Sequence, residues 1–466
     1  MSGIWIKRND LEKNTVQELW KLGAPTILEQ ALQTAVVYVD TAMVGHISAA
    51  ASAAVGLTTT INWLLNGIFF SVSVGMLSFI SRYTGSGEKE KAHRISAQAI
   101  WVLIGLAFIE TIIALWISPV LPKWMGANKE IWHDASVYFF IVSCPLLFRG
   151  ASIIFGNVLR ANKDSKTPMY VNVGVNLLNI LLNQLLIGSE TVIHTGGLVV
   201  RIPGMNFGVA GAAIATAVSQ SLGGIILFAA TMKNPLTTLK GERKKPDWAN
   251  LKDCFSVALP LIGERLVMGS GYIMFSALVA GLGTLSTAAH AIALTIEEAF
   301  YVPGYGVQTA VSTLSGNAAG RGSEEELNAV VKAGLRIAVS IMSVMSVFLF
   351  IGATGIMGIF STDTEVVELG ASVLRIVAVS EPLFAVLIIY EGVFHGIGET
   401  KIPFFFAIFT MWGIRNCMSW FLIRWFAAGL KTVWVCMVMD NVCRCILLVL
   451  LYKTKKWKKK RKGNGK

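Results

Sequence analysis

The chain has 466 residues, of which 54% are hydrophobic and 15% are charged, and its mean hydropathy is +0.61. A soluble domain of this length typically carries about 25% charged residues, so the composition excludes an ordinary soluble protein and indicates an integral membrane protein. The net charge of +12 is high, but no aromatic and basic recognition pattern accompanies the Lys-rich segments. We therefore expect no nucleic-acid partner.

Twelve apolar stretches follow one another along the chain. A membrane-spanning helix needs about 20 mostly apolar residues. The stretches are also continuous, unlike the short alternating strands of a membrane β-barrel. They lie near residues 16–45, 53–81, 95–118, 134–159, 168–188, 208–232, 254–280, 289–316, 328–358, 367–395, 403–426 and 430–452. We predict an all-α integral membrane protein with twelve transmembrane helices.

The basic residues predict the orientation of these helices. If both termini face the cytoplasm, the outer segments hold only Lys123, Lys129, Arg201 and Lys431, and nearly all other loop lysines and arginines lie inside. The positive-inside rule therefore predicts a multi-pass protein of the cell membrane, inner or plasma, with both termini in the cytoplasm. A Lys-rich tail beside a membrane typically pairs with anionic lipid headgroups, and we expect this of residues 454–466.

The second half of the chain repeats the first at one constant offset. The matching positions are VLRANKDSKTP at 158–168 with VFHGIGETKIP at 393–403, Pro25 with Pro260, and Gly85 with Gly320. Six spans separate the copies, so we expect two parallel six-helix lobes related by a pseudo-two-fold axis along the membrane normal, with a cavity between them. The predicted domains are an N-lobe at 1–232, a cytoplasmic linker at 233–252, a C-lobe at 253–453 and a basic cytoplasmic tail at 454–466.

Asp40 lies within the first apolar stretch. A carboxylate there costs roughly 3 kcal/mol or more, so such a residue usually marks an ion, proton or substrate path; the alternative is a structural carboxylate that hydrogen-bonds a neighbouring helix. Burial disfavours the charged form of a carboxyl group, so we expect Asp40 to bind and release a proton. Gln33 lies two turns earlier and Val37 borders the same face. Pro25 can bend this helix because it removes a backbone donor.

Asn172, Asn176, Asn179 and Asn183 are spaced by four, three and four residues, which places them along one face of the fifth span. Buried amides either join membrane helices or line a cavity, and both interpretations remain open. Asn179 and Asn183, nearest the middle of the span, are the stronger functional candidates. Sodium also favours carboxylate and amide oxygens, but with one clear carboxylate in the first half we favour the proton.

The second half holds its own intramembrane acids, of which Glu297, Glu298 and Glu381 are deep enough to be secondary candidates. Arginines lie in the same spans, so internal ion pairs are the default interpretation of these acids. The position equivalent to Asp40 is Phe275. We therefore predict the main site in the N-lobe.

The twelve spans, the parallel repeat, the string VLRANKDSKTP and the stretch from Pro25 to Asp40 resemble the multidrug and toxic compound extrusion (MATE) family, nearest its DinF branch. The likeness covers about residues 15 to 455. The family usually has an LRGxGDxKTP form after the fourth span, and Ala161 here replaces one glycine. The matching residues are Leu159, Arg160, Asp164, Lys166, Thr167 and Pro168.

The resemblance implies an antiporter that exports bulky cationic or amphipathic drugs from the cytoplasm by alternating access, driven by inward flow of H⁺ or Na⁺. It implies that Asp40 is the protonation site, and that bending of the helix near Pro25 expels substrate. Where related members carry a second aspartate in the fifth span, this chain has Asn183. The predicted cavity residues of the N-lobe, of which Asn157 is implied by the resemblance alone, are Gln33, Val37, Asp40, Asn157, Asn176, Asn179 and Asn183.

The resemblance also bears on the coupling ion. The NorM-like branch places cation ligands at positions that correspond to Met268 and Phe384, and neither side chain can bind a cation. Alternatives to a proton-coupled drug antiporter are a Na⁺-coupled one and a flippase for lipid-linked precursors. A flippase is expected to present arginines or lysines to a pyrophosphate, whereas the N-lobe spans show mainly Arg149.

An enzyme or a channel is a weaker interpretation of the sequence. No HExxH, GxSxG or P-loop string occurs, and the six histidines are scattered. Cysteine and histidine spacing predicts no metal site. We therefore predict a transporter without cofactor or metal, and one that works as a monomer because a two-lobed chain can form its cavity alone.

Overall fold

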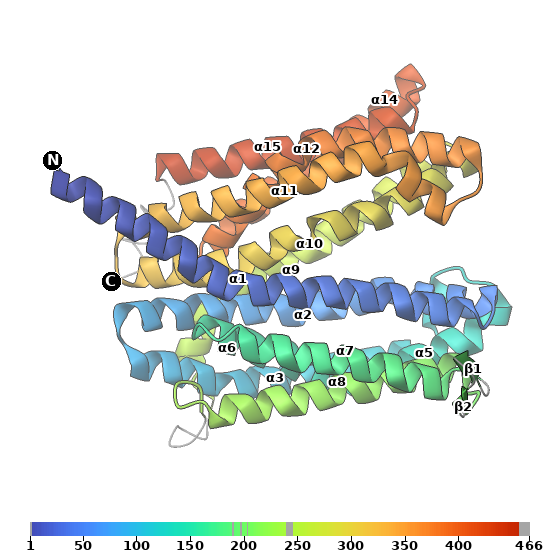
Figure 1. Cartoon of the computed structure of the whole chain (residues 1–466), viewed down its shortest axis with the longest axis horizontal. Helices are drawn as coiled ribbons and strands as arrows, with labels where there is room; N and C mark the ends of the chain where they lie inside the picture. The colour runs from blue at the N-terminus through green and yellow to red at the C-terminus, as the bar shows by residue number, and fades with distance from the viewer. Residues whose placement is uncertain (1, 189–190, 196–197, 203, 239–245, 456–466) are drawn as a thin grey trace. The chain divides into compact units, whose positions relative to one another are not determined.

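The computed structural model describes residues 2–188, 191–195, 198–202, 204–238 and 246–455. Most of these residues lie in long helices (Figure 1). The elements are α1 (Ser2–Gly45), α2 (Ala49–Ser86), α3 (Lys89–Ile117), α4 (Leu121–Trp124), η1 (Lys129–Ile131), α5 (Trp132–Ser143), α6 (Leu146–Ala161), α7 (Lys166–Leu186), β1 (Thr191–Thr195), β2 (Leu198–Ile202), α8 (Gly208–Lys233), α9 (Trp248–Ala280), α10 (Thr284–Gly320), α11 (Glu324–Phe360), α12 (Thr364–Ile397), α13 (Lys401–Ile408), the π-helix η2 (Phe409–Met418), α14 (Ser419–Phe426) and α15 (Leu430–Thr454). Residues 239–245 of the predicted linker and 456–466 of the predicted tail lie outside the described residues.

Each predicted apolar stretch falls on one helix or on consecutive helices. Within the described residues, 8 helices are long and apolar enough to cross a membrane, and the pair α5 and α6, bent by 52°, makes up to 9. The long helices α1, α9 and α10 do not meet this test, because polar residues such as Asp40, Glu264 and Glu297 interrupt their apolar stretches. The all-α membrane fold is confirmed, and for these three helices the crossing stays a prediction.

One element departs from the all-α prediction. Strands β1 and β2 pair as an antiparallel hairpin between α7 and α8, with Thr191 opposite Ile202 and Thr195 opposite Leu198. The segment TVIHTGGLVVRI is rich in β-branched residues and has two glycines at its centre, a pattern typical of a hairpin. The sequence therefore contained a signal for these strands that the prediction of an all-helical chain did not use.

Packing contacts divide the chain into two compact units. Unit 1 consists of Met1–Ile27, Leu77–Glu88 and Asp253–Lys466, and unit 2 consists of Leu28–Met76 and Lys89–Lys252. The division passes through α1 between Ile27 and Leu28. The lobe boundaries predicted from the repeat differ from these contact units at the ends of α1 and α2, and they stay a prediction.

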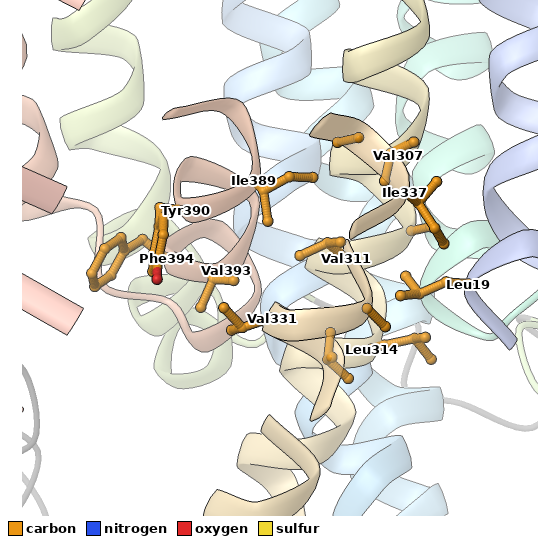
Figure 2. Close-up of a cluster of buried hydrophobic side chains, with 14 of the residues drawn as sticks. Leu19, Val307, Val311, Leu314, Val331, Ile337, Ile389, Tyr390, Val393 and Phe394 are labelled. Atoms are coloured by element: carbon orange, nitrogen blue, oxygen red, sulfur yellow. The ribbon is translucent and has the colours of Figure 1, made fainter. Parts of the chain in front are cut away.

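An apolar core of unit 1 lies where α10, α11 and α12 meet α1 around Leu19 and Leu22. Val307, Val311 and Leu314 are spaced by four and three residues, so they share one face of α10. Figure 2 shows this face packed among Leu19 of α1 and Ile337 of α11, with side chains of α12 beside it. The part of α1 around Leu19 and Leu22 is thereby anchored on the helices of the second half.

Two glycines bring the end of α2 against the backbone of α10, within unit 1. A Cβ atom on Gly85 would overlap the backbone oxygen of Asn317, and one on Gly320 would overlap the backbone oxygen of Arg82. Only glycine leaves room for backbones this close. The helix ends are therefore fixed by contact of main chain with main chain.

Candidate functional site

Asp40 is the centre of a polar cluster in unit 2, where its side chain is half-buried. Nδ2 of Asn183 donates a 2.5 Å hydrogen bond to Oδ1 of Asp40. With its amide oriented to donate, the Asn179 nitrogen lies 2.9 and 3.0 Å from the two carboxylate oxygens. Asn183 and Asn179 are only 1% and 5% exposed. Two buried amides of α7 therefore hold the carboxylate of α1.

Two further side chains complete this cluster. Thr216 of α8 places its hydroxyl oxygen 3.4 Å from the Asn179 amide. Tyr138 of α5 hydrogen-bonds Thr216, interacts electrostatically with Asp40, and packs against a buried apolar group around Val44. Hydrogen bonds thus connect the Asp40 carboxyl group through the amides of α7 to Thr216 of α8 and Tyr138 of α5.

Glu29, one helical turn after Pro25, is a second buried carboxylate on α1, with its side chain 7% exposed. Nη2 of Arg160 lies 2.6 and 2.7 Å from its two oxygens. Asn172 donates a further hydrogen bond of 2.5 Å to Oε1 of Glu29. A buried carboxylate with a guanidinium on both oxygens is a structural ion pair that ties α1 to α6 and α7.

Asn157 belongs to this Glu29 cluster. Its carbonyl accepts from Arg160 at 3.2 Å, and its amide donates to the Ser73 hydroxyl at 2.5 Å. The predicted N-lobe site is therefore divided into two clusters. Glu29 and Asp40 are 11 residues apart on α1, as are Asn172 and Asn183 on α7, which is about 16 Å along a helix.

The other predicted residues are placed less centrally. Gln33 and Val37 are exposed on α1, the latter by 57%, and Asn176 is half-buried on α7. None of the three takes part in the hydrogen bonds of the two clusters among the described side chains. Pro25 lies inside α1, which continues as a helix through it. The roles of these four residues stay predictions.

The expectation of one clear carboxylate in the first half is wrong. Glu29 and Glu110 are also buried in unit 2, at 6% and 4% exposed. Glu29 carried a signal, because it lies three turns before Asp40 on nearly the same helix face. Glu110 carried the same signal as Asp40, a lone acid within the apolar run AFIETIIALW. Tyr138 and Thr216 carried none, since such residues are common in membrane helices.

In unit 1, Glu297 and Glu381 are buried, at 7% and 1% exposed, whereas Glu298 is exposed. Glu297 interacts electrostatically with Glu381 and with Arg415 of the π-helix η2. The two secondary candidates therefore face the same interior, and Glu298 does not join them there.

Ion pairs are present in the second half, in agreement with their default interpretation. Arg415 lies 2.8 Å from Asp440 of α15, and these side chains are 3% and 0% exposed. Arg444 lies 3.7 Å from Glu391 of α12. A π-helix is a rare element that often occurs at functional sites, and here it places Arg415 against α15.

No group of three or more His, Cys, Asp and Glu side chains in the described part of the chain is arranged to hold a metal ion. Met268, at a position where the NorM-like branch has a cation ligand, packs with Ala407 and Met411. Phe384, at the other such position, stacks edge-on against Tyr301 at 5.3 Å. Phe384 therefore lies beside an aromatic ring, whereas the sulfur of Met268 also accepts a 4.0 Å contact from Nη1 of the buried Arg444.

Comparison with known proteins gives a family and a fold. A family model described as MatE matches residues 25–185 and 260–421. The two matches begin at Pro25 and Pro260, which are equivalent positions of the sequence repeat. They show that the same family unit occurs twice in the chain.

Curated relatives match almost the whole chain. The probable multidrug resistance protein NorM of Thermotoga maritima is 25% identical over 457 residues, covering 97% of this chain and 96% of that protein. A protein of the same name from Xanthomonas axonopodis is 24% identical, covering 93% and 92%. The uncharacterized transporter YisQ of Bacillus subtilis is 22% identical, covering 94% of each.

Solved structures share the fold. A MOP superfamily transporter from Pyrococcus furiosus is 23% identical with a TM-score of 0.85, covering 95% of this chain and 96% of that one. A variant of the MATE transporter VcmN of Vibrio cholerae is 18% identical, also with a TM-score of 0.85, covering 96% and 98%. The arrangement of helices is therefore that of solved MATE transporters.

Proposed function

The chain belongs to the MatE family, whose model matches both of its halves, and on that premise we propose that this multidrug efflux transporter is a proton-coupled antiporter of the DinF-like branch. It exports bulky cationic or amphipathic drugs from the cytoplasm by alternating access. Asp40 is the protonation site, and α1 bends near Pro25 during the cycle. It is a multi-pass membrane transporter and not an enzyme.

The observation that carries this proposal is the contrast between the two carboxylates of α1. Glu29 is held by the Arg160 guanidinium, a cation in contact with its carboxylate. Asp40 is held by the neutral amides of Asn179 and Asn183, and it forms no ion pair with any described residue. Its charge can therefore change without leaving a buried cation unpaired.

The amides of Asn179 and Asn183 can form hydrogen bonds with Asp40 in both of its protonation states. An ionised carboxylate accepts hydrogen bonds only, whereas a protonated carboxyl group also donates one. Oδ1 of Asn183 is buried and has no hydrogen-bond donor among the described residues, so it can accept from a protonated Asp40. Protonation then changes the hydrogen bonds between α1 and α7.

The contacts of α1 support a hinge near Pro25. The helix belongs to unit 1 up to Ile27 and to unit 2 from Leu28. A proline inside a helix removes one backbone hydrogen bond and weakens the turn before it. One turn later, Glu29 fixes the helix to Arg160. A change of bend at Pro25 would therefore move the part of α1 that follows it. The hydrogen bonds of Glu29 and of Asp40 attach this part to α6 and α7 at two separate points.

A flippase for lipid-linked precursors is less well supported. Its pyrophosphate would need a free cation, but Arg149 is 7% exposed and donates to two oxygens of Asn62 at 3.1 and 3.3 Å. In a Na⁺-coupled transporter, the ion would bind to the same oxygens of Asp40, Asn179 and Asn183. The dependence of substrate binding on Na⁺ and on pH distinguishes the two kinds of coupling.

The test is equilibrium binding of ethidium, a planar organic cation, to the purified protein across pH and Na⁺ concentration. We expect binding to weaken as pH falls in the parent, no such dependence in Asp40→Asn, and no effect of Na⁺ at constant ionic strength. The exposed acid Glu130 provides a matched control as Glu130→Gln. Binding that follows Na⁺ and ignores pH would replace the proton with sodium.

Three further expectations belong to the proposal. The excess of basic residues in alternate loops supports cytoplasmic termini. The Lys-rich segment 454–466 supports contact with anionic lipid headgroups. The repeat supports a transporter that works as a monomer, because both lobes come from one chain.

A further inference from the structure

We propose that the rings of Tyr301 and Tyr305 on α10 and of Phe384 on α12 form a binding subsite for aromatic organic cations in unit 1, with the carboxylate of Glu298 beside it. This inference rests on the proposed export of cationic drugs and names residues of the second half that bind them.

The three rings lie against one another at steep angles. The ring centroid of Tyr301 is 5.6 Å from that of Tyr305, with the planes at 84°, and 5.3 Å from that of Phe384, with the planes at 61°. Tyr301 and Phe384 border the apolar core of unit 1, but all three residues are only half-buried. Several aromatic rings inclined to one another are the arrangement that binds quaternary ammonium ligands in proteins.

Glu298 indicates what this face of α10 meets. It lies three residues before Tyr301, and Tyr305 lies four residues after, so the three side chains share one face of the helix. The helix continues through Pro303, and the ring contact between Tyr301 and Tyr305 shows that the shared face is kept.

The depth of this face in the membrane supports access by a ligand. Glu298 and Tyr301 lie near the middle of α10, and Glu298 is exposed. An acid at the middle of a membrane-spanning helix faces the protein interior or a water-filled cavity and not lipid. An exposed acid at this depth therefore indicates a cavity. Tyrosines that anchor a helix at the membrane surface lie near its ends, which does not describe Tyr301 or Tyr305.

A second contact aligns α10 with α12 along this face. Nε2 of Gln308 donates to Oε2 of Glu391 at 3.4 Å. Gln308 lies seven residues after Tyr301, and Glu391 lies seven residues after Phe384. Seven residues are about two helical turns, so the same faces of the two helices meet at both levels. The position of the Phe384 ring against Tyr301 is thereby fixed by the packing of two helices.

The charges along this face leave one carboxylate for a ligand. Arg444 lies 3.7 Å from Glu391, so the acid at the level of Gln308 already has a cation. Glu298 forms no ion pair or hydrogen bond with any described residue. Its negative charge can therefore compensate the charge of a cation that binds to the neighbouring rings.

These groups select a large organic cation. Phe384 has no oxygen with which to ligate Na⁺, but the face of an aromatic ring attracts a cation within about 6 Å of its centre. A planar aromatic cation adds ring stacking to this attraction. The subsite therefore fits a cation such as ethidium better than a neutral molecule of the same shape.

The test compares equilibrium binding of two probes to the purified protein at one pH: ethidium, and the neutral diaminophenylphenanthridine that is ethidium without its N-ethyl group. In Tyr301→Leu and in Phe384→Leu, we expect ethidium to bind about 2- to 30-fold more weakly, as for the loss of a cation–π contact. The neutral probe should lose clearly less affinity. Glu298→Gln should weaken the binding of ethidium alone, and Tyr301→Phe, which keeps the ring, should bind both probes like the parent.

Phe421→Leu is the matched control, because it removes an exposed ring of the same unit that is tilted against Trp425 at 6.3 Å. Thermal unfolding checks that each variant is folded, and Phe384→Leu carries the test if Tyr301→Leu does not fold. Unchanged ethidium binding, or equal losses for the two probes, would overturn the inference, because the rings then serve only packing. The proposed function fails separately, if Asp40→Asn keeps the pH dependence of ethidium binding seen in the parent.

Discussion

Gly85 of α2 and Gly320 of α10 make the same contact from the two repeats. Gly85 lies against the backbone of Asn317, and Gly320 lies against the backbone of Arg82. Gly85 and Gly320 are equivalent positions of the sequence repeat, and so are Arg82 and Asn317. The pair of contacts is therefore two-fold symmetric, which agrees with the parallel repeat predicted from the sequence and with the two family matches.

The residues at the centre of this contact are also equivalent. A Cβ atom on Gly316 would lie 2.6 Å from Cβ of Ser81, and the offset of the repeat relates these two positions as well. A two-fold axis that relates the two repeats passes midway between any equivalent residues that contact each other. Within unit 1, Ser81 and Gly316 mark that point.

The first prediction concerns the contact between Gly85 and the backbone of Asn317. Gly85→Ala places a methyl group on the backbone of Asn317, and we expect a loss of about 1–3 kcal/mol from overpacking. Gly56→Ala in the same helix meets open space, and we expect it to be neutral or to stabilise by up to about 1 kcal/mol through helix propensity. Thermal unfolding in detergent measures both. Equal effects of the two substitutions would contradict the close approach.

The second prediction concerns Glu29 and Arg160. Glu29→Gln leaves a buried guanidinium without its carboxylate, and we expect a loss of about 3–5 kcal/mol. Arg160→Met strands the carboxylate and should cost a similar amount. The double variant should cost clearly less than the two losses added together, because the residues act as a pair. Chemical or thermal unfolding of the four proteins measures this coupling, and additive losses would exclude it.

The third prediction concerns Glu12, which precedes the first apolar stretch. Partial burial raises the pKa of Glu12, but the hydrogen bond from Arg336 at 3.0 Å and the charges of Arg336 and Lys332 outweigh it and hold the pKa below its ordinary value. A group with a lowered pKa in the folded state stabilises above its unfolded pKa, and the effect is lost as pH falls through the folded pKa. The contact stabilises at neutral pH.

Glu12→Gln should therefore lower the free energy of unfolding at pH 7 by less than about 1 kcal/mol, because Arg336 and Lys332 are 62% and 48% exposed. The difference should vanish in acid, once Glu12 of the parent is protonated. Asp10→Asn, a change of an exposed acid on the same helix, is the control. A difference that persists in acid would show that packing and not charge is responsible.

The sequence predicted the features that depend on periodicity along one helix. The spacing of Asn179 and Asn183 placed them on one face, and a lone acid in an apolar stretch singled out Asp40; the structure brings all three together. The repeat offset followed from Pro25 and Pro260, and the two family matches begin at these same residues.

Features that depend on pairing between helices were not predicted. Glu29 and Arg160 are 131 residues apart, and no pattern along either helix indicates which residue the other will meet. For the same reason Asn157 was expected beside Asp40 but lies with Glu29. The π-helix at Phe409–Met418 was also missed, because its hydrogen bonds shift by one residue without a sequence signal of their own.

The central claim is that Asp40 couples substrate export to protons, and the most direct measurement is ethidium transport by proteoliposomes under an imposed proton gradient. The parent protein should move ethidium against the direction of proton flow, with no response to a Na⁺ gradient of equal size. Asp40→Asn, folded as judged by thermal unfolding, should bind ethidium but lose the response to the proton gradient. Export by Asp40→Asn at the rate of the parent, still driven by protons, would contradict the account.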